Sequence, residues 1–468
     1  MAPRTITAEE TDLAQQLLAN ARRAMAQVAA YDQARVDRIC QAVGWAGANP
    51  DTALRLANMS VDESGLGSRE PKRRGKVLGI LRDALRQKSM GVIEEIPEKG
   101  IVKYAKPAGV ICSLIPVTSP YITPIGIAIY AIKCKDAVVF SPHPSSRATT
   151  FETVRLMRVA LRELGVPEDL LQCVEKPSIP LANELMSVCD LTIATGGPAM
   201  VKAAYSSGKP AYGVGAGNAT MVIDETADIT EAARHTAISK TNDHGSGCSA
   251  DGNLVVDASI YDALLQQLQD EGGYLVDARQ KQQLQRAYWD EQGRRTADTI
   301  ARPAAVIAEK AGFTLPPNKS FLLVEESQIG KQHLFSTEKL GVVLAVFKAQ
   351  GFDDALDKVR QIFETGGKGH SCGIYSFNDD HINRLALMAP VSRIMVRQVQ
   401  SSSNAGTFTN GMPMTSSMGC GVWGGNITNE NVALKHYMNV TWVSRPIAED
   451  KPSEAELFGE FYSAKTPA

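Results

Sequence analysis

The chain has 468 residues, of which 44% are hydrophobic and 21% are charged, a composition typical of a globular protein. This length exceeds that of one ordinary hydrophobic core, so two domains are expected. Lys and Arg number 49 and Asp and Glu 51, for a net charge of −2. The sequence has neither an excess of positive charge nor a basic block, so nothing in it indicates a nucleic-acid partner.

The eight cysteines are scattered and show neither the CxxC spacing of redox and zinc motifs nor a Cys/His cluster with metal-ligand spacing. Such usage is typical of a reducing compartment. Residues 1–10 lack the apolar run of a signal peptide, and no segment has the uninterrupted apolar length of a transmembrane helix. We therefore expect a cytoplasmic protein with no metal and no membrane partner.

The first 70 or so residues have helical periodicity, and residues 91–106 alternate around a Pro/Gly turn as a β-hairpin does. From residue 109 short apolar strands alternate with helices, which indicates a parallel sheet covered on both faces. Ligands bind outside the carboxyl ends of such strands. The turns at residues 116–120, 141–146 and 195–198 are therefore expected on the binding side.

A second run of alternating strands and helices follows Cys248 and predicts a second domain of the same class. We expect a nucleotide-binding domain at residues 1–220 with the hairpin arm at 91–106. A catalytic domain with a cysteine nucleophile is expected at 221–435, and a C-terminal strand and tail at 436–468. The strand at residues 440–444 is the predicted partner of the hairpin.

The segment from Asn242 to Ala250 contains one cysteine, Cys248, among small residues just before a strand-like run. Substrate and backbone N–H groups can approach a thiol closely in such a setting, as a nucleophile requires. A buried structural cysteine is the alternative, because cysteine is among the most buried residue types. The glycines beside Cys248 favour the nucleophile.

The sequence motifs along the chain, taken in their order, resemble those of the aldehyde dehydrogenase superfamily, and more narrowly those of its CoA-acylating branch. The resemblance covers essentially the whole chain. It implies an α/β fold of two Rossmann-like parallel-sheet domains with a β-hairpin oligomerisation arm. These motifs lie at residues 109–120, 140–144, 194–198, 208–218, 242–250, 367–370 and 419–426.

The resemblance implies that Cys248 attacks an aldehyde to form a thiohemiacetal, which becomes an enzyme thioester once hydride has left. The oxyanion would be stabilised by the backbone N–H of the cysteine and by a side chain in the turn at residues 116–120. Ordinary relatives have Asn in this turn, whereas this chain has Thr118, followed by Ser119. A turn hydroxyl bonded to its own backbone is the alternative for Thr118.

Hydrolytic relatives carry a Glu before a Gly-Gly pair as the general base for water, but residues 212–218 contain no carboxylate. Water without a base is a poor nucleophile near neutral pH, whereas a thiol such as coenzyme A is partly ionised. The missing Glu therefore favours thiolysis and an acyl-CoA product. Gly215 and the neighbouring glycines would allow close backbone approach beside the nicotinamide.

The nicotinamide cofactor, NADP or NAD, is assigned to the turns that end the first strands, where free N–H groups meet a pyrophosphate. Hydrolytic relatives carry Lys and Glu in the turn at residues 141–146, where this chain has Ser141 and Pro144. Without the acid, a 2′-phosphate would meet no repulsion and Arg147 could pair with it, which favours NADP⁺. The candidates are Pro116, Ser141, His143, Arg147, Thr195, Gly196, Gly197, Gly215 and Glu338.

Glu338 stands where the family binds the nicotinamide ribose, with a solvated loop carboxylate as the alternative. His370 matches an acylating-branch phrase and is a candidate for proton transfer or for orienting a bound group, with a packing role open. His244 is a weaker candidate for activating the thiol. Ser119 and Asn242 are further candidates beside the turn and the nucleophile.

Phrases at residues 391–397 and 439–446 look similar to sulfoacetaldehyde dehydrogenases, which interconvert sulfoacetaldehyde and sulfoacetyl-CoA. A sulfonate needs cationic or neutral donors near Cys248, and the polar run at residues 401–407 offers neutral ones. Acetaldehyde or propanal is the alternative substrate. Rival functions are a hydrolytic aldehyde dehydrogenase, a reductase of another activated acyl group and a catalytically silent scaffold.

The hairpin at residues 91–106 and the strand at 440–444 would leave exposed edges in a monomer. Pairing of these edges between subunits removes the exposure. The sequence therefore predicts a homodimer or homotetramer.

Overall fold

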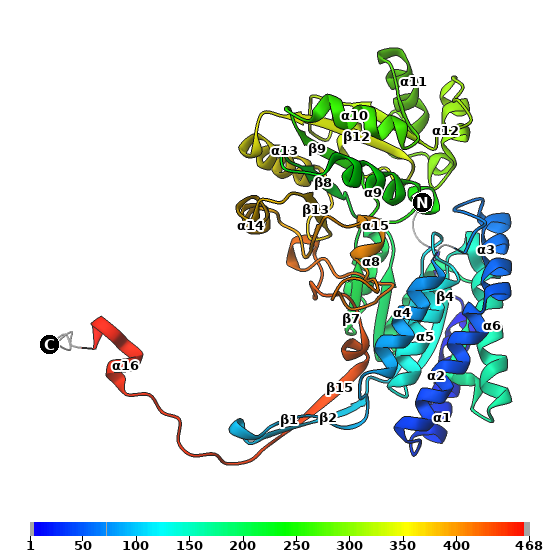
Figure 1. Cartoon of the computed structure of the whole chain (residues 1–468). Helices are drawn as coiled ribbons and strands as arrows, with labels where there is room; N and C mark the ends of the chain where they lie inside the picture. The colour runs from blue at the N-terminus through cyan, green and yellow to red at the C-terminus, as the bar shows by residue number, and fades with distance from the viewer. Residues whose placement is uncertain (1–3, 72, 463–468) are drawn as a thin grey trace.

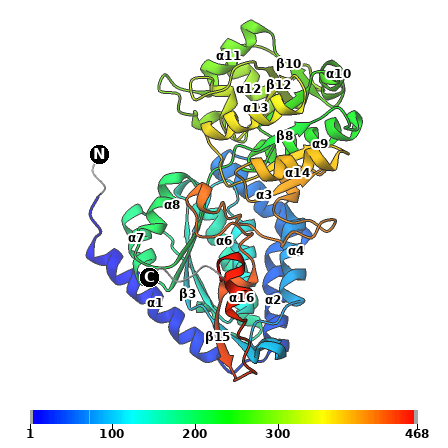
Figure 2. The same ribbon diagram turned by 90° about the vertical axis from the view of Figure 1, so that its left-hand side faces the viewer.

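The protein is described by a computed structural model, which covers residues 4–71 and 73–462. Figure 1 shows two α/β units, one above the other, and a narrow arm that projects from the lower unit. Figure 2 shows the same two units after a quarter turn. No helix among the described residues is both long enough and apolar enough to span a membrane.

The first unit is built on a five-stranded parallel sheet in the order β5-β4-β3-β6-β7. The right-handed rule for parallel crossovers places α5 and α6 on one face and α7 on the other. Helix α1 packs against α7, and α2 covers α5 and α6. The elements are α1 (Ala8–Val28), α2 (Gln33–Ala48), α3 (Pro50–Ser64), α4 (Arg74–Leu85), β3 (Val110–Ile115), α5 (Ile122–Lys133), β4 (Ala137–Pro142), α6 (Arg147–Glu163), β5 (Leu171–Cys173), α7 (Ile179–Val188), β6 (Leu191–Thr195), α8 (Pro198–Tyr205) and β7 (Ala211–Val214).

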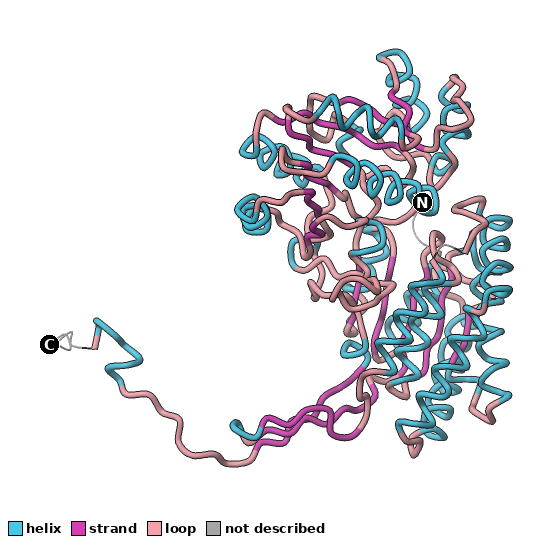
Figure 3. The backbone as a smooth tube through the Cα atoms, viewed as in Figure 1, coloured by secondary structure: helices cyan, strands magenta, loops and turns pink. Residues whose placement is uncertain are grey.

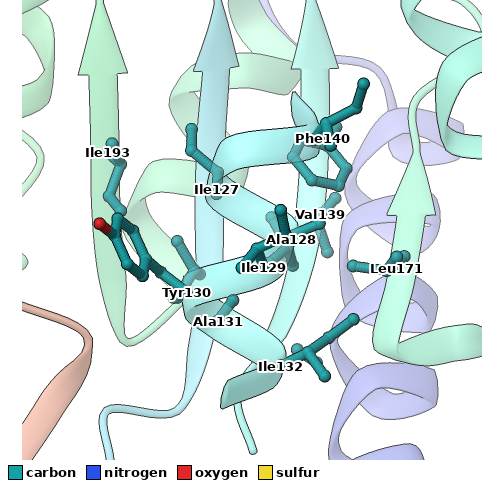
Figure 4. Packing of buried hydrophobic residues seen from close by; sticks show 14 of the residues in the cluster. Ile127, Ala128, Ile129, Tyr130, Ala131, Ile132, Val139, Phe140, Leu171 and Ile193 are labelled. Carbon is teal, nitrogen blue, oxygen red and sulfur yellow. The ribbon is translucent and has the colours of Figure 1, made fainter. Parts of the chain in front are cut away.

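Helix α5 is buried on every side, so its residues are apolar all round instead of forming a single stripe. Figure 4 shows its side chains from Ile127 to Ile132 packed onto the strands, where Phe140 and Ile193 lie. Removing apolar surface of this kind from water contributes roughly 25 cal/mol per Å². Helix α5 is therefore the centre of the first hydrophobic core.

The second unit is a seven-stranded parallel sheet in the order β10-β11-β12-β9-β8-β13-β14. The parallel pairing in both sheets confirms the predicted fold class. Figure 3 shows helices on both sides of its strands. The elements are β8 (Thr220–Ile223), α9 (Ile229–Thr241), β9 (Asn253–Asp257), α10 (Tyr261–Asp270), β10 (Gly273–Leu275), α11 (Ala278–Tyr288), α12 (Ala304–Ala311), β11 (Phe321–Glu325), β12 (Val343–Ala349), α13 (Phe352–Thr365), β13 (Cys372–Tyr375), α14 (Asp379–Met388), β14 (Ile394–Val396) and α15 (Gln400–Ser403).

The chain returns to the first unit after β14, where Met414, Val432 and Leu434 join the first core. Tyr130 of α5 donates a hydrogen bond to the carbonyl of Met414 at 2.7 Å. The sequence predicted that residues up to 435 belong to the second domain, whereas this returning segment packs into the core of the first unit. No local pattern marks the return, because the contacts join residues far apart in sequence.

The arm is an antiparallel sheet of β1 (Gly91–Ile96), β2 (Ile101–Pro107) and β15 (Met438–Ser444), in that order. Strand β15 pairs with β2 from Met438 opposite Pro107 to Ser444 opposite Ile101, which confirms the predicted partner of the hairpin. Beyond β15 the chain runs away from the body to α16 (Glu454–Phe458). The outer strand therefore has no intramolecular neighbour on its far edge among the described residues.

Candidate active site

The first sheet reverses its strand order between β3 and β6, because β4 and β5 lie on one side of β3 and β6 and β7 on the other. Ligands of open parallel sheets bind at such a switch point, outside the carboxyl ends of the strands. Strand β3 runs into the turn at residues 116–120, and β6 runs into Thr195 and Gly196. Both turns line one cavity of about 880 Å³.

The second unit presents the opposite edge of its sheet to this cavity. The loops that enter β9, β12 and β13 carry Cys248, Glu338 and His370, respectively. These strands lie close together in the order β12-β9-β8-β13 and are parallel, so their entering loops meet at one edge. This topology brings together three side chains that are far apart in the sequence.

The thiol of Cys248 contacts an imidazole, because its Sγ lies 3.0 Å from Nε2 of His370. On the other side of the ring, Nδ1 lies 2.9 Å from Oγ of Ser371. A neutral imidazole with its proton on Nδ1 satisfies both contacts, since Nε2 then accepts from the thiol. Arg393 donates to the carbonyl of His370 at 2.9 Å and fixes the backbone there.

Burial keeps this pair uncharged. It raises the pKa of Cys248 to about 12, and the negative charge of Glu338 acts in the same direction. The cationic Lys76 and Arg73 oppose the rise. Burial, followed by the charge of Arg393, lowers the pKa of His370 to about 3. The resting pair is therefore a neutral thiol beside a neutral imidazole that can accept its proton.

The turn before Cys248 is held in an unusual conformation. Asp243 and His244 both have φ of 51°, in the left-handed region that residues with a Cβ seldom adopt. The carboxylate of Asp243 accepts from the N–H of Ser68 at 2.6 Å and from Oγ of Ser246 at 2.8 Å, and it pairs with Arg73 at 2.9 Å. These contacts offset the strain and set the position of the nucleophile segment.

Close backbone packing fixes the other side of the nucleophile. A Cβ built on Gly217 would lie 2.0 Å from the carbonyl oxygen of Cys248, so only glycine fits there. The N–H of Gly217 donates to Oε1 of Glu338 at 3.0 Å, and Arg295 contacts Oε2 at 3.3 Å. Burial raises the pKa of Glu338 against these two contacts.

The cavity that contains Cys248 holds two donors suited to an oxyanion. Among the described residues, neither the backbone N–H of Cys248 nor the hydroxyl of Thr118 has a hydrogen-bond partner. The carbonyl of Thr118 is bound by Arg73 at 3.2 Å, which holds the turn at residues 116–120 against the nucleophile segment. Free preorganised donors at a nucleophile are what a tetrahedral oxyanion needs.

The pyrophosphate of a dinucleotide fits the start of α8. Its N-cap is Gly197, which supplies no side chain to the free N–H groups, and a Cβ built there would meet open space. Anions bind such helix ends through backbone N–H groups. Glu338 lines the same cavity, where it accepts a hydrogen bond from the N–H of Gly217. The residues present therefore suit a nicotinamide dinucleotide.

Most of the sequence-predicted site residues line this one cavity. Four do not: Ser141 is buried at the end of β4, Arg147 is exposed at the start of α6, His244 lies in the turn before Cys248, and His370 lies behind the sulfur of Cys248. The residues that line the cavity are Pro116, Thr118, Ser119, His143, Thr195, Gly196, Gly197, Gly215, Asn242, Cys248 and Glu338.

Sequence reasoning missed a carboxylate at the turn that follows β4. Glu63 of α3 accepts from the N–H groups of Ala148 and Thr149, each at 2.8 Å, and from the hydroxyl of Thr149. It caps α6 beside Arg147, where the local sequence contains no acid. A capping acid from a different helix carries no signal in the segment that it caps.

Four cationic residues of the cavity wall were also missed: Arg73, Lys76, Arg295 and Arg302. Arg73 and Lys76 belong to a basic run at residues 72–76, which by itself is typical of a solvated helix start. Arg295 lies in a polar loop with no motif. Only the fold brings their charges to the cavity.

A model of the aldehyde dehydrogenase family matches residues 4–285. The chain is 43% identical to a sulfoacetaldehyde dehydrogenase of Acholeplasma sp, over 92% of this chain and 90% of that one. It is 40% identical to an acylating sulfoacetaldehyde dehydrogenase of Bilophila wadsworthia (strain 3_1_6), over 94% and 97%. Its structure is similar to that of an acetylating aldehyde dehydrogenase from Geobacillus thermoglucosidasius, with a TM-score of 0.91, 33% identity and coverage of 95% and 99%.

Proposed function

The chain belongs to the aldehyde dehydrogenase family, and we propose that it oxidises an aldehyde with NAD(P)⁺ and transfers the acyl group to coenzyme A. Sulfoacetaldehyde is the favoured substrate and sulfoacetyl-CoA the product. The overall reaction is aldehyde + CoA + NAD(P)⁺ → acyl-CoA + NAD(P)H + H⁺. The reaction places the protein among the oxidoreductases that act on aldehydes.

The observation that carries the proposal is a thiol paired with a base in a cavity that has no free carboxylate. Among the described residues, the carboxylates that line the cavity are Glu338 and Asp298. Glu338 is paired with Arg295 and Asp298 with Lys310. Each carboxylate is engaged by a cation, so neither is free to accept a proton from an attacking water. Thiolysis by CoA is therefore favoured over hydrolysis to a free acid.

The first step is attack of Cys248 on the aldehyde carbonyl. The thiol proton passes to Nε2 of His370 as the C–S bond forms, so that the sulfur attacks without a pre-formed thiolate. The N–H of Cys248 and the hydroxyl of Thr118 donate to the oxyanion. The start of α8 and Glu338 would hold the nicotinamide cofactor, which would accept the hydride.

The second step is transfer of the acyl group from Cys248 to CoA. His370 first releases to solvent the proton that it took from Cys248, which is the H⁺ of the overall equation. The CoA thiol then gives its proton to His370 and attacks the thioester carbon, and the C–S bond to Cys248 breaks. The same two donors stabilise the second oxyanion. The leaving sulfur is reprotonated by His370, which restores the neutral pair.

The preference between the two nicotinamide cofactors rests on the turn after β4. Arg147 at the start of α6 favours the 2′-phosphate of NADP⁺, as the sequence suggested. Glu63 caps the same helix and opposes that phosphate. Comparison of kcat/KM for NADP⁺ and NAD⁺ decides which charge dominates.

The arm supports assembly into a homodimer or homotetramer. Trp442 and Val443 are exposed by 59% and 38% on β15, an edge strand with unpaired backbone groups. Exposed apolar edge strands are normally covered, because they otherwise promote aggregation. A second copy of the arm would cover both the edge and these side chains.

The proposal is tested by trapping the acyl-enzyme. Wild-type protein and Cys248→Ser are incubated with sulfoacetaldehyde and NAD(P)⁺ without CoA, and the intact mass of each is measured. The wild type is expected to gain one acyl group and to lose it when CoA is added, while the variant gains none. An adduct on Cys248→Ser, or loss of the wild-type adduct in water as fast as with CoA, contradicts the proposal.

A further inference from the structure

Lys76 differs from the other cations of the active-site cavity. It lies in the first turn of α4, and its side chain lines the cavity together with Cys248, Thr118 and Gly75. Within the described part of the chain, its ammonium group has neither a hydrogen-bond partner nor an ion-pair partner. Lys76 is half-buried. An unpaired cation on a cavity wall attracts an anionic ligand, because no protein group neutralises its charge.

The remaining cavity cations are all occupied. Arg73 is paired with Asp243 at 2.9 Å and Arg295 with Glu338 at 3.3 Å. Arg302 donates to the carbonyl of Gly65. Among the described residues, Lys76 is therefore the cation of this wall that is free to bind an anionic ligand.

Lys76 lies within electrostatic reach of the nucleophile. Its charge lowers the pKa of Cys248, and a charged Cys248 would raise that of Lys76 in return. Burial, with the nearby charge of Arg73, lowers the pKa of Lys76 to about 8, so it is largely protonated at neutral pH. The N-terminal end of α4, where Gly75 leaves open space, adds a favourable dipole.

We propose that Lys76 binds the sulfonate of the substrate and sets the preference for an aldehyde that carries an anionic group one carbon from its carbonyl. This inference rests on the proposed function. A sulfonate remains ionised at every relevant pH and offers three oxygens that an ammonium can bind. Lys76 would then orient the carbonyl toward Cys248 by holding the opposite end of a short molecule.

The test compares the selectivity of matched variants. Lys76→Met removes the charge, Lys76→Arg keeps it, and Lys88→Met removes an exposed lysine just after the same helix. For each protein kcat/KM is measured with sulfoacetaldehyde and with propanal, at saturating CoA and NAD(P)⁺. The quantity of interest is the ratio of the two values, since a general loss of activity cancels in it.

The ratio for Lys76→Met is expected to fall about 100-fold, the loss typical of one hydrogen-bonded charge pair, mostly through the KM for sulfoacetaldehyde. Lys76→Arg is expected to retain most of the preference, and Lys88→Met all of it. Ethanesulfonate should inhibit propanal oxidation competitively, and more weakly in Lys76→Met. An unchanged ratio and inhibition constant in Lys76→Met would overturn the inference. Lys76→Gln provides the same test if Lys76→Met does not fold.

The wild-type measurements separate this inference from the proposed function. CoA-dependent oxidation of propanal without oxidation of sulfoacetaldehyde overturns the role of Lys76 and leaves the acylating reaction standing. No CoA-dependent oxidation of either aldehyde overturns the proposed function itself.

Discussion

The high pKa of the Cys248 thiol predicts an unusual pH dependence of its alkylation. Only the thiolate reacts at an appreciable rate, so the rate constant follows the thiolate fraction. With a pKa of about 12, that fraction is about 10⁻⁵ at pH 7 and rises tenfold for each pH unit. A thiol with an unperturbed pKa near 8.5 would be about 3% ionised at pH 7 and would level off above pH 9.

The assay is alkylation by iodoacetamide in the absence of substrates, followed by intact mass from pH 6 to 10. Cys248→Ser supplies the background, which should be small because, of the other cysteines, only Cys173 is not buried. The logarithm of the Cys248 rate constant is expected to rise with a slope of one and without a plateau. A plateau below pH 9 would refute the reasoning, because burial and Glu338 would then not be holding the proton on sulfur.

Three further predictions follow from the same site and from the arm. His370→Ala should lower kcat/KM about 10²–10⁴-fold, the usual contribution of a general base, and the deficit should shrink as pH rises because hydroxide replaces the base; a loss below threefold, or one constant with pH, contradicts this role. Glu338→Gln removes a charge that raises the pKa of Cys248, so alkylation at pH 8 should be faster while KM for the cofactor rises; slower alkylation refutes the electrostatic argument. Trp442→Glu should lower the mass measured by light scattering, whereas Trp45→Glu, exposed on α2, should not; an unchanged mass for Trp442→Glu would show that the arm is not an interface.

Much of the fold is predictable because its signals are local. The alternation at residues 91–106 and the Pro/Gly turn indicate a hairpin, and the apolar runs before residues 116, 142 and 195 indicate buried strands. Strands β5 and β7 escaped notice, since Leu171–Cys173 is only three residues long and Ala211–Val214 contains a glycine. Their strand conformation depends on neighbours in the sheet rather than on their own composition.

The site likewise combines residues that the local sequence marks with contacts that only the fold creates. The segment around Cys248 and the turns at residues 116–120 and 195–198 are recognisable because glycine and proline mark them. The contact between His370 and Cys248 joins residues 122 positions apart and depends on β9 and β13 lying near each other. Lys76 is less predictable still, because a lysine in a helical first turn is ordinary until the fold places it in a cavity.

The central claim is that the acyl group leaves Cys248 by thiolysis. The most direct test is nicotinamide reduction by purified wild-type protein with sulfoacetaldehyde, acetaldehyde and propanal, each with and without CoA. The account predicts one turnover per active site without CoA and continuous turnover with it, fastest for sulfoacetaldehyde. Equal steady-state rates with and without CoA would contradict the account, since a water-activating base would then be present in the cavity.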